Sequence, residues 1–185
     1  MTNHLYDAVF GRHAGSDRIF LYTADGEISF AAFAALTNRL ANLLVAEGLA
    51  PGDRVAVQAD KSVMLLALYA ATVKAGGVYL PLNTGYTASE LDYFLGDAKP
   101  RIVVVAQAAE AQIAPIAERG GAALLTLDAD EAGSLRDGAM KQDADFTAVP
   151  RGSEDLAAIL YTSGTTGRSK GCLLYTSPSP RDLWI

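Results

Sequence analysis

The sequence has too little cysteine and histidine for a disulfide or a metal centre. It contains one cysteine, Cys172, and two histidines, His4 and His13. One thiol cannot form an internal disulfide or a Cys-x-x-Cys metal site. Both histidines stand in a polar N-terminal segment without a pattern of carboxylates or cysteines around them, which is typical of surface residues. The sequence therefore predicts no resident metal and no nucleophile constellation.

A basic excess and a long apolar run are also missing. Fifteen Lys and Arg stand against 21 Asp and Glu, for a formal net charge of −6. This balance argues against binding to nucleic acid or to an anionic membrane surface. No apolar stretch approaches the ~20 residues that span a bilayer, and the N-terminus lacks the basic head and apolar centre of a signal peptide. We expect a cytoplasmic globular unit with a sizeable core and no implied protein partner.

Apolar strands and helices alternate along the chain. We expect strands at 18–23, 27–30, 54–58, 78–82, 102–105, 123–127 and 156–160, and helices at 29–48, 62–74, 88–97 and 108–119. Ser29 can cap the first helix, and Thr87 with Glu90 forms a capping-box sequence before the third. Continuous apolar strands joined by helices indicate a mostly parallel α/β sheet covered on both faces, with the strand that ends near Tyr161 in its interior. The polar residues 128–153 predict a long surface connection.

The segment YTSGTTGRSKG, residues 161–171, concentrates polar donors directly after an apolar strand. Its hydroxyl side chains are Thr162, Ser163, Thr165 and Thr166, its glycines are Gly164, Gly167 and Gly171, and its terminal cation is Lys170. Such a loop can hold polyphosphate, because glycines let backbone N–H groups approach the oxygens while hydroxyls and an ammonium add donors. The Walker spacing is absent. The alternative is a flexible surface turn, in which Lys170 is a solvated lysine.

This loop resembles the AMP-binding signature of the adenylate-forming enzymes, which include acyl-CoA synthetases, luciferases and adenylation domains of peptide synthetases. Every position from Ile159 to Lys170 fits, although Ser169 stands where many members have proline. The segment 74–101 (KAGGVYLPLNTGYTASELDYFLGDAKPR) is similar to the family as well. Its variant, with Thr84-Gly85 and Thr87 at positions where proline is usual, resembles malonyl-CoA synthetases. The resemblance implies that residues 1–171 are the N-terminal part of the family's large α/β domain.

The resemblance also implies a two-step reaction. A carboxylate, here malonate, attacks the α-phosphorus of Mg²⁺-ATP, and coenzyme A then displaces AMP from the acyl-adenylate. Lys170 is the implied catalytic cation, and the implied phosphate-binding residues are Thr162, Ser163, Gly164, Thr165, Thr166, Gly167 and Lys170. Ligands for Mg²⁺, the acid and coenzyme A are expected beyond Gly171. We therefore expect an acid–thiol ligase whose first 171 residues are inactive alone.

The tail CLLYTSPSPRDLWI, residues 172–185, departs from the family, which continues with a short apolar run and a Thr/Ser-His pair. The peptide CLLYTSPSPRD is also the translation of a DNA string that resembles a transposase-end adapter from sequencing libraries. We interpret 172–185 as a non-native read-through tail; a divergent native end and a disordered terminus are the alternatives. Because Pro178 and Pro180 exclude a helix, we expect the tail to be extended or poorly ordered and to pack on nothing.

Two other functions remain open at this point. The chain could belong to an adenylation module of a peptide synthetase, or it could be a non-catalytic polyphosphate-binding module that is complete as it stands. In this family the pocket for the carboxylate lies beyond Gly171. Residues 1–171 therefore leave the choice of acid undecided.

Overall fold

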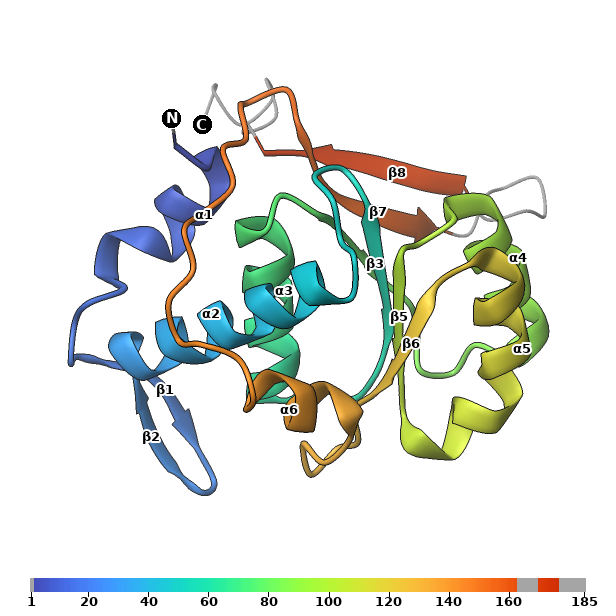
Figure 1. The fold of residues 1–185 in the computed structure, drawn as a ribbon, viewed down its shortest axis with the longest axis horizontal. Helices are drawn as coiled ribbons and strands as arrows, with labels where there is room; N and C mark the ends of the chain where they lie inside the picture. The colour runs from blue at the N-terminus through green and yellow to red at the C-terminus, as the bar shows by residue number, and fades with distance from the viewer. Residues whose placement is uncertain (1, 163–169, 177–185) are drawn as a thin grey trace.

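The chain folds around a six-stranded sheet that has helices on both faces (Figure 1). The computed structural model describes residues 2–162 and 170–176. The strand order is β6 (Ala123–Thr126), β5 (Ile102–Val105), β3 (Arg54–Gln58), β4 (Val78–Pro81), β7 (Leu156–Thr162) and β8 (Lys170–Tyr175). All neighbours are parallel except β7 and β8, which are antiparallel. A separate hairpin joins β1 (Ile19–Thr23) to β2 (Gly26–Ser29). The predicted mostly parallel α/β sheet is confirmed, and β7 lies inside it.

The helices divide between the two faces of the sheet. One face is covered by α1 (His4–Val9), α2 (Phe30–Ala46), α3 (Val63–Lys74) and α6 (Ser134–Ala139), and the other by α4 (Ala88–Ala98) and α5 (Glu110–Gly120). Two 3₁₀ turns, Gly11–His13 and Gln107–Ala109, complete the described elements. Strand β5 shows why its sequence is continuously apolar: Val104 packs with the first group of helices and Val105 with the second. Within the described ranges, no helix is long and apolar enough to cross a membrane.

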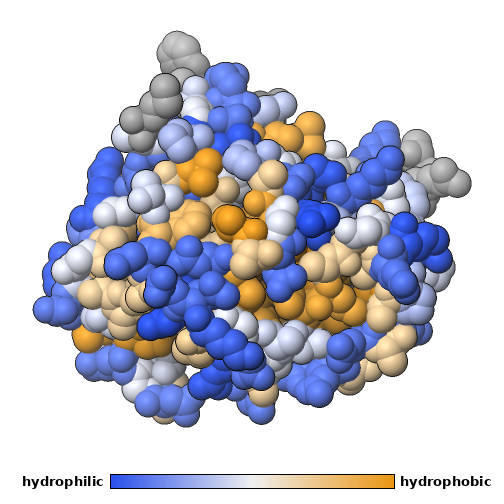
Figure 2. Space-filling model, viewed as in Figure 1, coloured by the Kyte–Doolittle hydropathy of each residue, from blue (hydrophilic) through white to orange (hydrophobic). Residues whose placement is uncertain are grey.

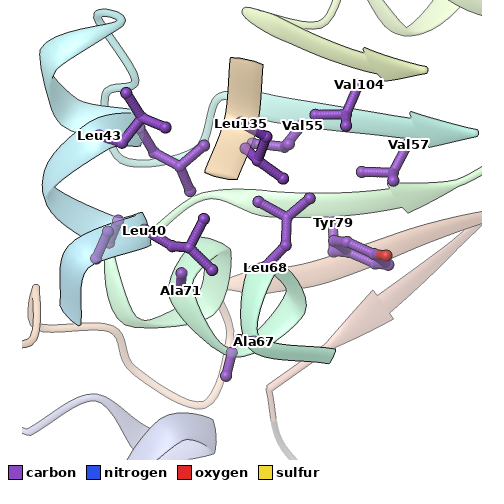
Figure 3. Close-up of a cluster of buried hydrophobic side chains, with 14 of the residues drawn as sticks. Leu40, Leu43, Val55, Val57, Ala67, Leu68, Ala71, Tyr79, Val104 and Leu135 are labelled. Atoms are coloured by element: carbon purple, nitrogen blue, oxygen red, sulfur yellow. The ribbon is translucent and has the colours of Figure 1, made fainter. Parts of the chain in front are cut away.

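Helix α3 forms the centre of the larger core. Figure 3 shows Leu68 of α3 pointing toward the sheet, between Leu40 of α2, Leu135 of α6 and Tyr79 of β4. Leu40, Leu68 and Leu135 are each 0% exposed. Apolar residues nearly encircle α3, which accounts for its deep burial.

Two segments that looked polar in sequence contribute to this core. The connection 128–153 contains α6, whose Leu135 and Ala139 are fully buried, so the prediction of a surface connection throughout was wrong. Gly133 precedes α6 at φ 132°, where a Cβ atom would clash with the Thr126 carbonyl. The N-terminal segment likewise forms α1 and buries Tyr6. Each helix has only six residues, which is too short to show a helical period in the sequence.

A buried lysine ties α1 to α3. The Lys74 ammonium donates to Asn38 Oδ1 and lies 4.8 Å from the centre of the Tyr6 ring. Burial lowers the pKa of Lys74, and the Asp7 carboxylate partly opposes this. Burial also raises the pKa of Tyr6 to about 12, with a smaller contribution from Asp7. Asn3 completes the connection, because its Nδ2 donates to the Val73 carbonyl over 2.8 Å.

The capping box before α4 gives a direct stability prediction. The Thr87 hydroxyl accepts from the Glu90 N–H, and the Glu90 carboxylate accepts from the Thr87 N–H over 2.8 Å. Replacing Thr87 by alanine should therefore lower the free energy of unfolding by about 1 kcal/mol in urea titrations.

The same contacts set the pH dependence of the cap. Hydrogen bonds from the Thr87 backbone, and secondly from its side chain, lower the pKa of Glu90. Because the pKa of Glu90 is lower in the folded state, its contribution to stability is present above the unfolded-state pKa. That contribution is lost as pH falls through the folded-state pKa. The difference in stability between wild type and Thr87→Ala should thus shrink in acid; a difference independent of pH would contradict the assigned cap.

The tail does not behave as the sequence predicted. Residues Cys172–Tyr175 are extended, as expected, but they pair with β7 as part of β8, and Thr176 is buried. The Thr176 N–H donates to the Asp155 carbonyl over 2.9 Å. An edge strand can form from main-chain hydrogen bonds alone, so this segment needed no amphipathic pattern to pair. Trp184 and the two prolines lie outside the described residues.

Several large apolar side chains are exposed on the described part of the chain. In the antiparallel pair β7–β8, the exposed large apolar residues are Leu160, Leu173, Leu174 and Tyr175. Figure 2 shows further hydrophobic residues reaching the surface in the middle of the viewed face, among hydrophilic residues. Exposed apolar groups of this size mark surfaces that associate or are covered by other parts of a protein.

Candidate functional site

The candidate phosphate site begins where β7 leaves the parallel sheet. Strand β7 pairs with β4 through a single pair of Cα partners, Tyr79 and Ala158. From Ile159 to Thr162 its only ladder partner among the described residues is β8. Figure 1 shows the β7–β8 hairpin crossing one edge of the sheet, with the end of β7 directed toward α4. The segment that carries the predicted phosphate donors therefore extends beyond the support of β4.

The structure brings the first and last predicted donors together. Thr162 and Lys170 are Cα partners in the antiparallel β7–β8 ladder. Side chains of directly opposed residues lie on the same face of a ladder, so the Thr162 hydroxyl and the Lys170 ammonium share one face. Both residues are exposed. The other predicted donors, Ser163, Gly164, Thr165, Thr166 and Gly167, lie outside the described residues.

Tyr161 faces the opposite way and fixes the end of β7 to α4. Its hydroxyl donates to Asp97 Oδ2 over 2.5 Å, and its ring centre lies 4.6 Å from that of Phe94. Phe94 is itself buried. Burial raises the pKa of Tyr161, and the hydrogen bond and negative charge of Asp97 raise it further. Tyr161 is therefore a neutral donor at physiological pH.

A second polar loop follows β4 at the carboxyl edge of the parallel strands. Gln58, the last residue of β3, donates from Nε2 to the carbonyls of Asn83 and Tyr86, each over 2.9 Å. Asn83 Oδ1 accepts from the Gly85 N–H over 2.8 Å. An Asn side chain that bonds two residues ahead closes a turn without proline. This turn explains how the chain accommodates Thr84-Gly85 where the family usually has proline.

A hollow of about 290 Å³ lies away from these residues, between α4 and α5. Val103, Lys99 and Arg119 are among the residues that line it. Neither Thr162 nor Lys170 lines it. Among the described residues, no group of three or more His, Cys, Asp or Glu side chains could hold a metal ion. Within the described residues, the candidate site thus consists of the Thr162 hydroxyl and the Lys170 ammonium.

Residues 10–177 match the family described as AMP-binding enzyme. The chain belongs to this adenylate-forming family. It is also 51% identical to MatB from Rhodopseudomonas palustris, with a TM-score of 0.91, over 95% of this chain and 35% of MatB. The resemblance to malonyl-CoA synthetases that the segment 74–101 carries is confirmed by this match. MatB has also been solved with ATP bound, at the same similarity.

The curated relatives include a CoA ligase and an antimetabolite synthetase. The long-chain-fatty-acid–CoA ligase FadD13 of Mycobacterium tuberculosis is 35% identical over 149 residues, which are 80% of this chain and 30% of that protein. The AMB antimetabolite synthetase AmbB of Pseudomonas aeruginosa is 33% identical over 171 residues, which are 92% of this chain and 13% of that protein. The chain spans about a third or less of the length of these relatives.

Sequence reasoning missed the contact between Tyr161 and Asp97. Both residues stand inside the two segments that resemble the family, but they are 64 positions apart. A single sequence has no periodicity or spacing that could pair them. The contact follows from the way α4 packs beside the diverging end of β7.

Proposed function

We propose that this chain is the N-terminal part of an ATP-dependent acid–thiol ligase that activates malonate and transfers it to coenzyme A. The observation that carries the proposal is the pairing of Thr162 with Lys170 at the base of the family's signature loop. This pairing sets an ammonium and a hydroxyl on one face, where the β- and γ-phosphates of ATP would need donors.

The chemistry assigned to the loop is stabilisation of a leaving anion. A carboxylate oxygen of the substrate forms a bond to the α-phosphorus of ATP. The bond between the α-phosphorus and the oxygen that bridges it to the β-phosphorus breaks, and pyrophosphate leaves with the negative charge. Lys170 and the hydroxyls of Thr162, Ser163, Thr165 and Thr166 are the proposed partners of that charge. Gly164 and Gly167 would allow backbone N–H groups to approach the same oxygens. Mg²⁺ would enter with the nucleotide.

Malonate is favoured as the acid by the segment that follows β4. Its variant, LNTGYT at residues 82–87, resembles malonyl-CoA synthetases, and the Asn83 turn gives that variant a defined conformation. The second candidate function is amino acid activation in a peptide synthetase. The similarity to AmbB over 92% of this chain favours it.

The test compares this chain with a longer one. A chimera would join residues 1–171 to the part of R. palustris MatB that follows the matching position, which the 51% identity and 0.91 TM-score make feasible. We expect malonate-dependent pyrophosphate release and malonyl-CoA formation by the chimera, and neither by the 185-residue chain. The physical reason is that one loop can stabilise charge on only one side of the phosphates.

Three outcomes separate the proposals. Because the carboxylate pocket lies beyond Gly171, the acid is tested on the full-length protein encoded by the source gene, where activation of amino acids but not malonate would favour the peptide synthetase assignment. Activation of no acid would contradict the ligase proposal. Turnover by the 185-residue chain itself would contradict the proposal that residues beyond 171 are required.

We also propose that residues 172–185 are a read-through tail on a ligase gene. Sequencing the source DNA beyond the codon for Gly171 tests this directly. A codon series for an apolar run followed by Thr/Ser-His would support the proposal. Genomic codons for CLLYTSPSPRD would overturn it.

A further inference from the structure

We propose that Tyr161 and Asp97 form a positioning pair that aims the phosphate loop from helix α4. This inference rests on the proposed function and deepens it, because it assigns residues outside the loop to the adenylation step. Tyr161 precedes Thr162, the first donor of the loop. Asp97 lies in the last turn of α4.

The end of β7 has no second neighbouring strand to hold it among the described residues. Beyond Ala158, β7 is bonded to β8 but has no ladder partner on its β4 side among the described residues. A two-stranded ribbon that leaves its sheet is free to twist and bend as a unit. The direction of its tip must therefore come from side-chain contacts.

The described side-chain contacts of this ribbon with α4 meet at Tyr161. In residues 159–162 and 170–175, the only side chain that hydrogen-bonds to another described element is Tyr161, through Asp97. The same ring packs on the buried Phe94, and Ile159 lies against the same apolar cluster. A hydroxyl that donates to a carboxylate forms a short, directional bond, and a buried ring beneath it restricts the rotamer.

The alternation of side chains along β7 links this pair to the proposed donors. In a strand, successive side chains point to opposite faces, so Tyr161 holds one face of the hairpin and Thr162 with Lys170 occupy the other. Fixing Tyr161 thus fixes the angle at which Thr162 and Lys170 are presented. Neither Tyr161 nor Asp97 is assigned any contact with the nucleotide.

The 185-residue chain provides the first test. Hydrogen–deuterium exchange of the amides at 160–162 and 170–172 should be about tenfold faster in Tyr161→Phe and in Asp97→Ala, because the ribbon opens more often without its tie. Asp97→Asn keeps an acceptor oxygen and should restore slow exchange. Asp92→Ala is the matched control: it removes a carboxylate of the same helix that pairs with Arg119 instead. Unchanged exchange in the two breaking variants would overturn the proposal.

The chimera with MatB provides the second test. Tyr161→Phe and Asp97→Ala should each lower kcat for adenylate formation about tenfold, since a displacement of ~1 Å at the reacting groups costs up to about 100-fold. KM for malonate and the conversion of preformed malonyl-adenylate to the thioester should stay within about twofold. The double variant should be no slower than either single variant, because both remove one contact.

The outcomes distinguish this inference from the function on which it rests. Additive losses in the double variant, or equal losses in both half-reactions, would overturn the positioning role. If the unmodified chimera activates no acid, the proposed function fails, and the exchange measurement still decides whether the pair holds the hairpin.

Discussion

Replacing Lys170 by alanine in the chimera should lower kcat/KM for ATP by more than tenfold, a loss of more than ~1.4 kcal/mol of transition-state stabilisation. The reason is electrostatic: Lys170 lies at the end of the loop and shares a face with Thr162, where the charge of departing pyrophosphate would develop. Steady-state pyrophosphate release at varied ATP measures the effect.

The loss should be confined to the first half-reaction. Pyrophosphate has left before the thiol attacks, so formation of the thioester from preformed acyl-adenylate should change by about twofold at most in Lys170→Ala. Lys141→Ala, which removes an exposed lysine that follows α6, is the matched control. A kinetically silent Lys170→Ala would show that the assigned role is wrong.

Truncating Leu68 to alanine should lower the free energy of unfolding by about 2–5 kcal/mol, because the cavity left by the side chain adds to the lost burial. Leu68 is 0% exposed and lies between two helices and the sheet (Figure 3). Domains of this size are stable by only about 5–15 kcal/mol, so the variant should be partly unfolded at moderate urea concentrations.

Leu173→Ala is the comparison for this experiment. The same side chain is removed from β8, where it is 48% exposed, and the expected loss is within about 0.5 kcal/mol. Equal losses at the two positions would contradict the assignment of the core to α3. Urea titration followed by circular dichroism measures both variants.

The sequence predicted most of the fold because its strands and longer helices carry strong local signals. Strand Arg54–Gln58 and strand Ile102–Val105 have the predicted bounds, and the Thr87–Glu90 capping box sets the start of α4 as expected. Helix α6 was missed because its burial depends on Leu135 and Ala139 alone. Two apolar residues in a polar segment become informative only once the sheet edge that they cover is known.

The chemistry of the candidate site stays a prediction from residue types, whereas the contacts that support it are visible only in the structure. A strand followed by hydroxyl residues, glycines and Lys170 indicates a phosphate loop from residue types alone. The hydrogen bond from Tyr161 to Asp97 depends on how α4 packs beside the end of β7, which is a property of the three-dimensional packing. The pairing of Cys172–Tyr175 with β7 was missed for a related reason, since main-chain bonding at an edge needs little sequence pattern.

Because Lys74 is shielded from solvent, the rate at which its amine is chemically labelled would report how often the domain opens. Four lysines, Lys61, Lys99, Lys141 and Lys170, are exposed, whereas Lys74 is covered by α1 and Asn38. An amine-reactive acylating reagent would label the four at once, but it would reach Lys74 only when α1 lifts or the core opens. The ratio of slow to fast labelling within one molecule would therefore count opening events of the N-terminal cover, with the exposed amines as internal standards.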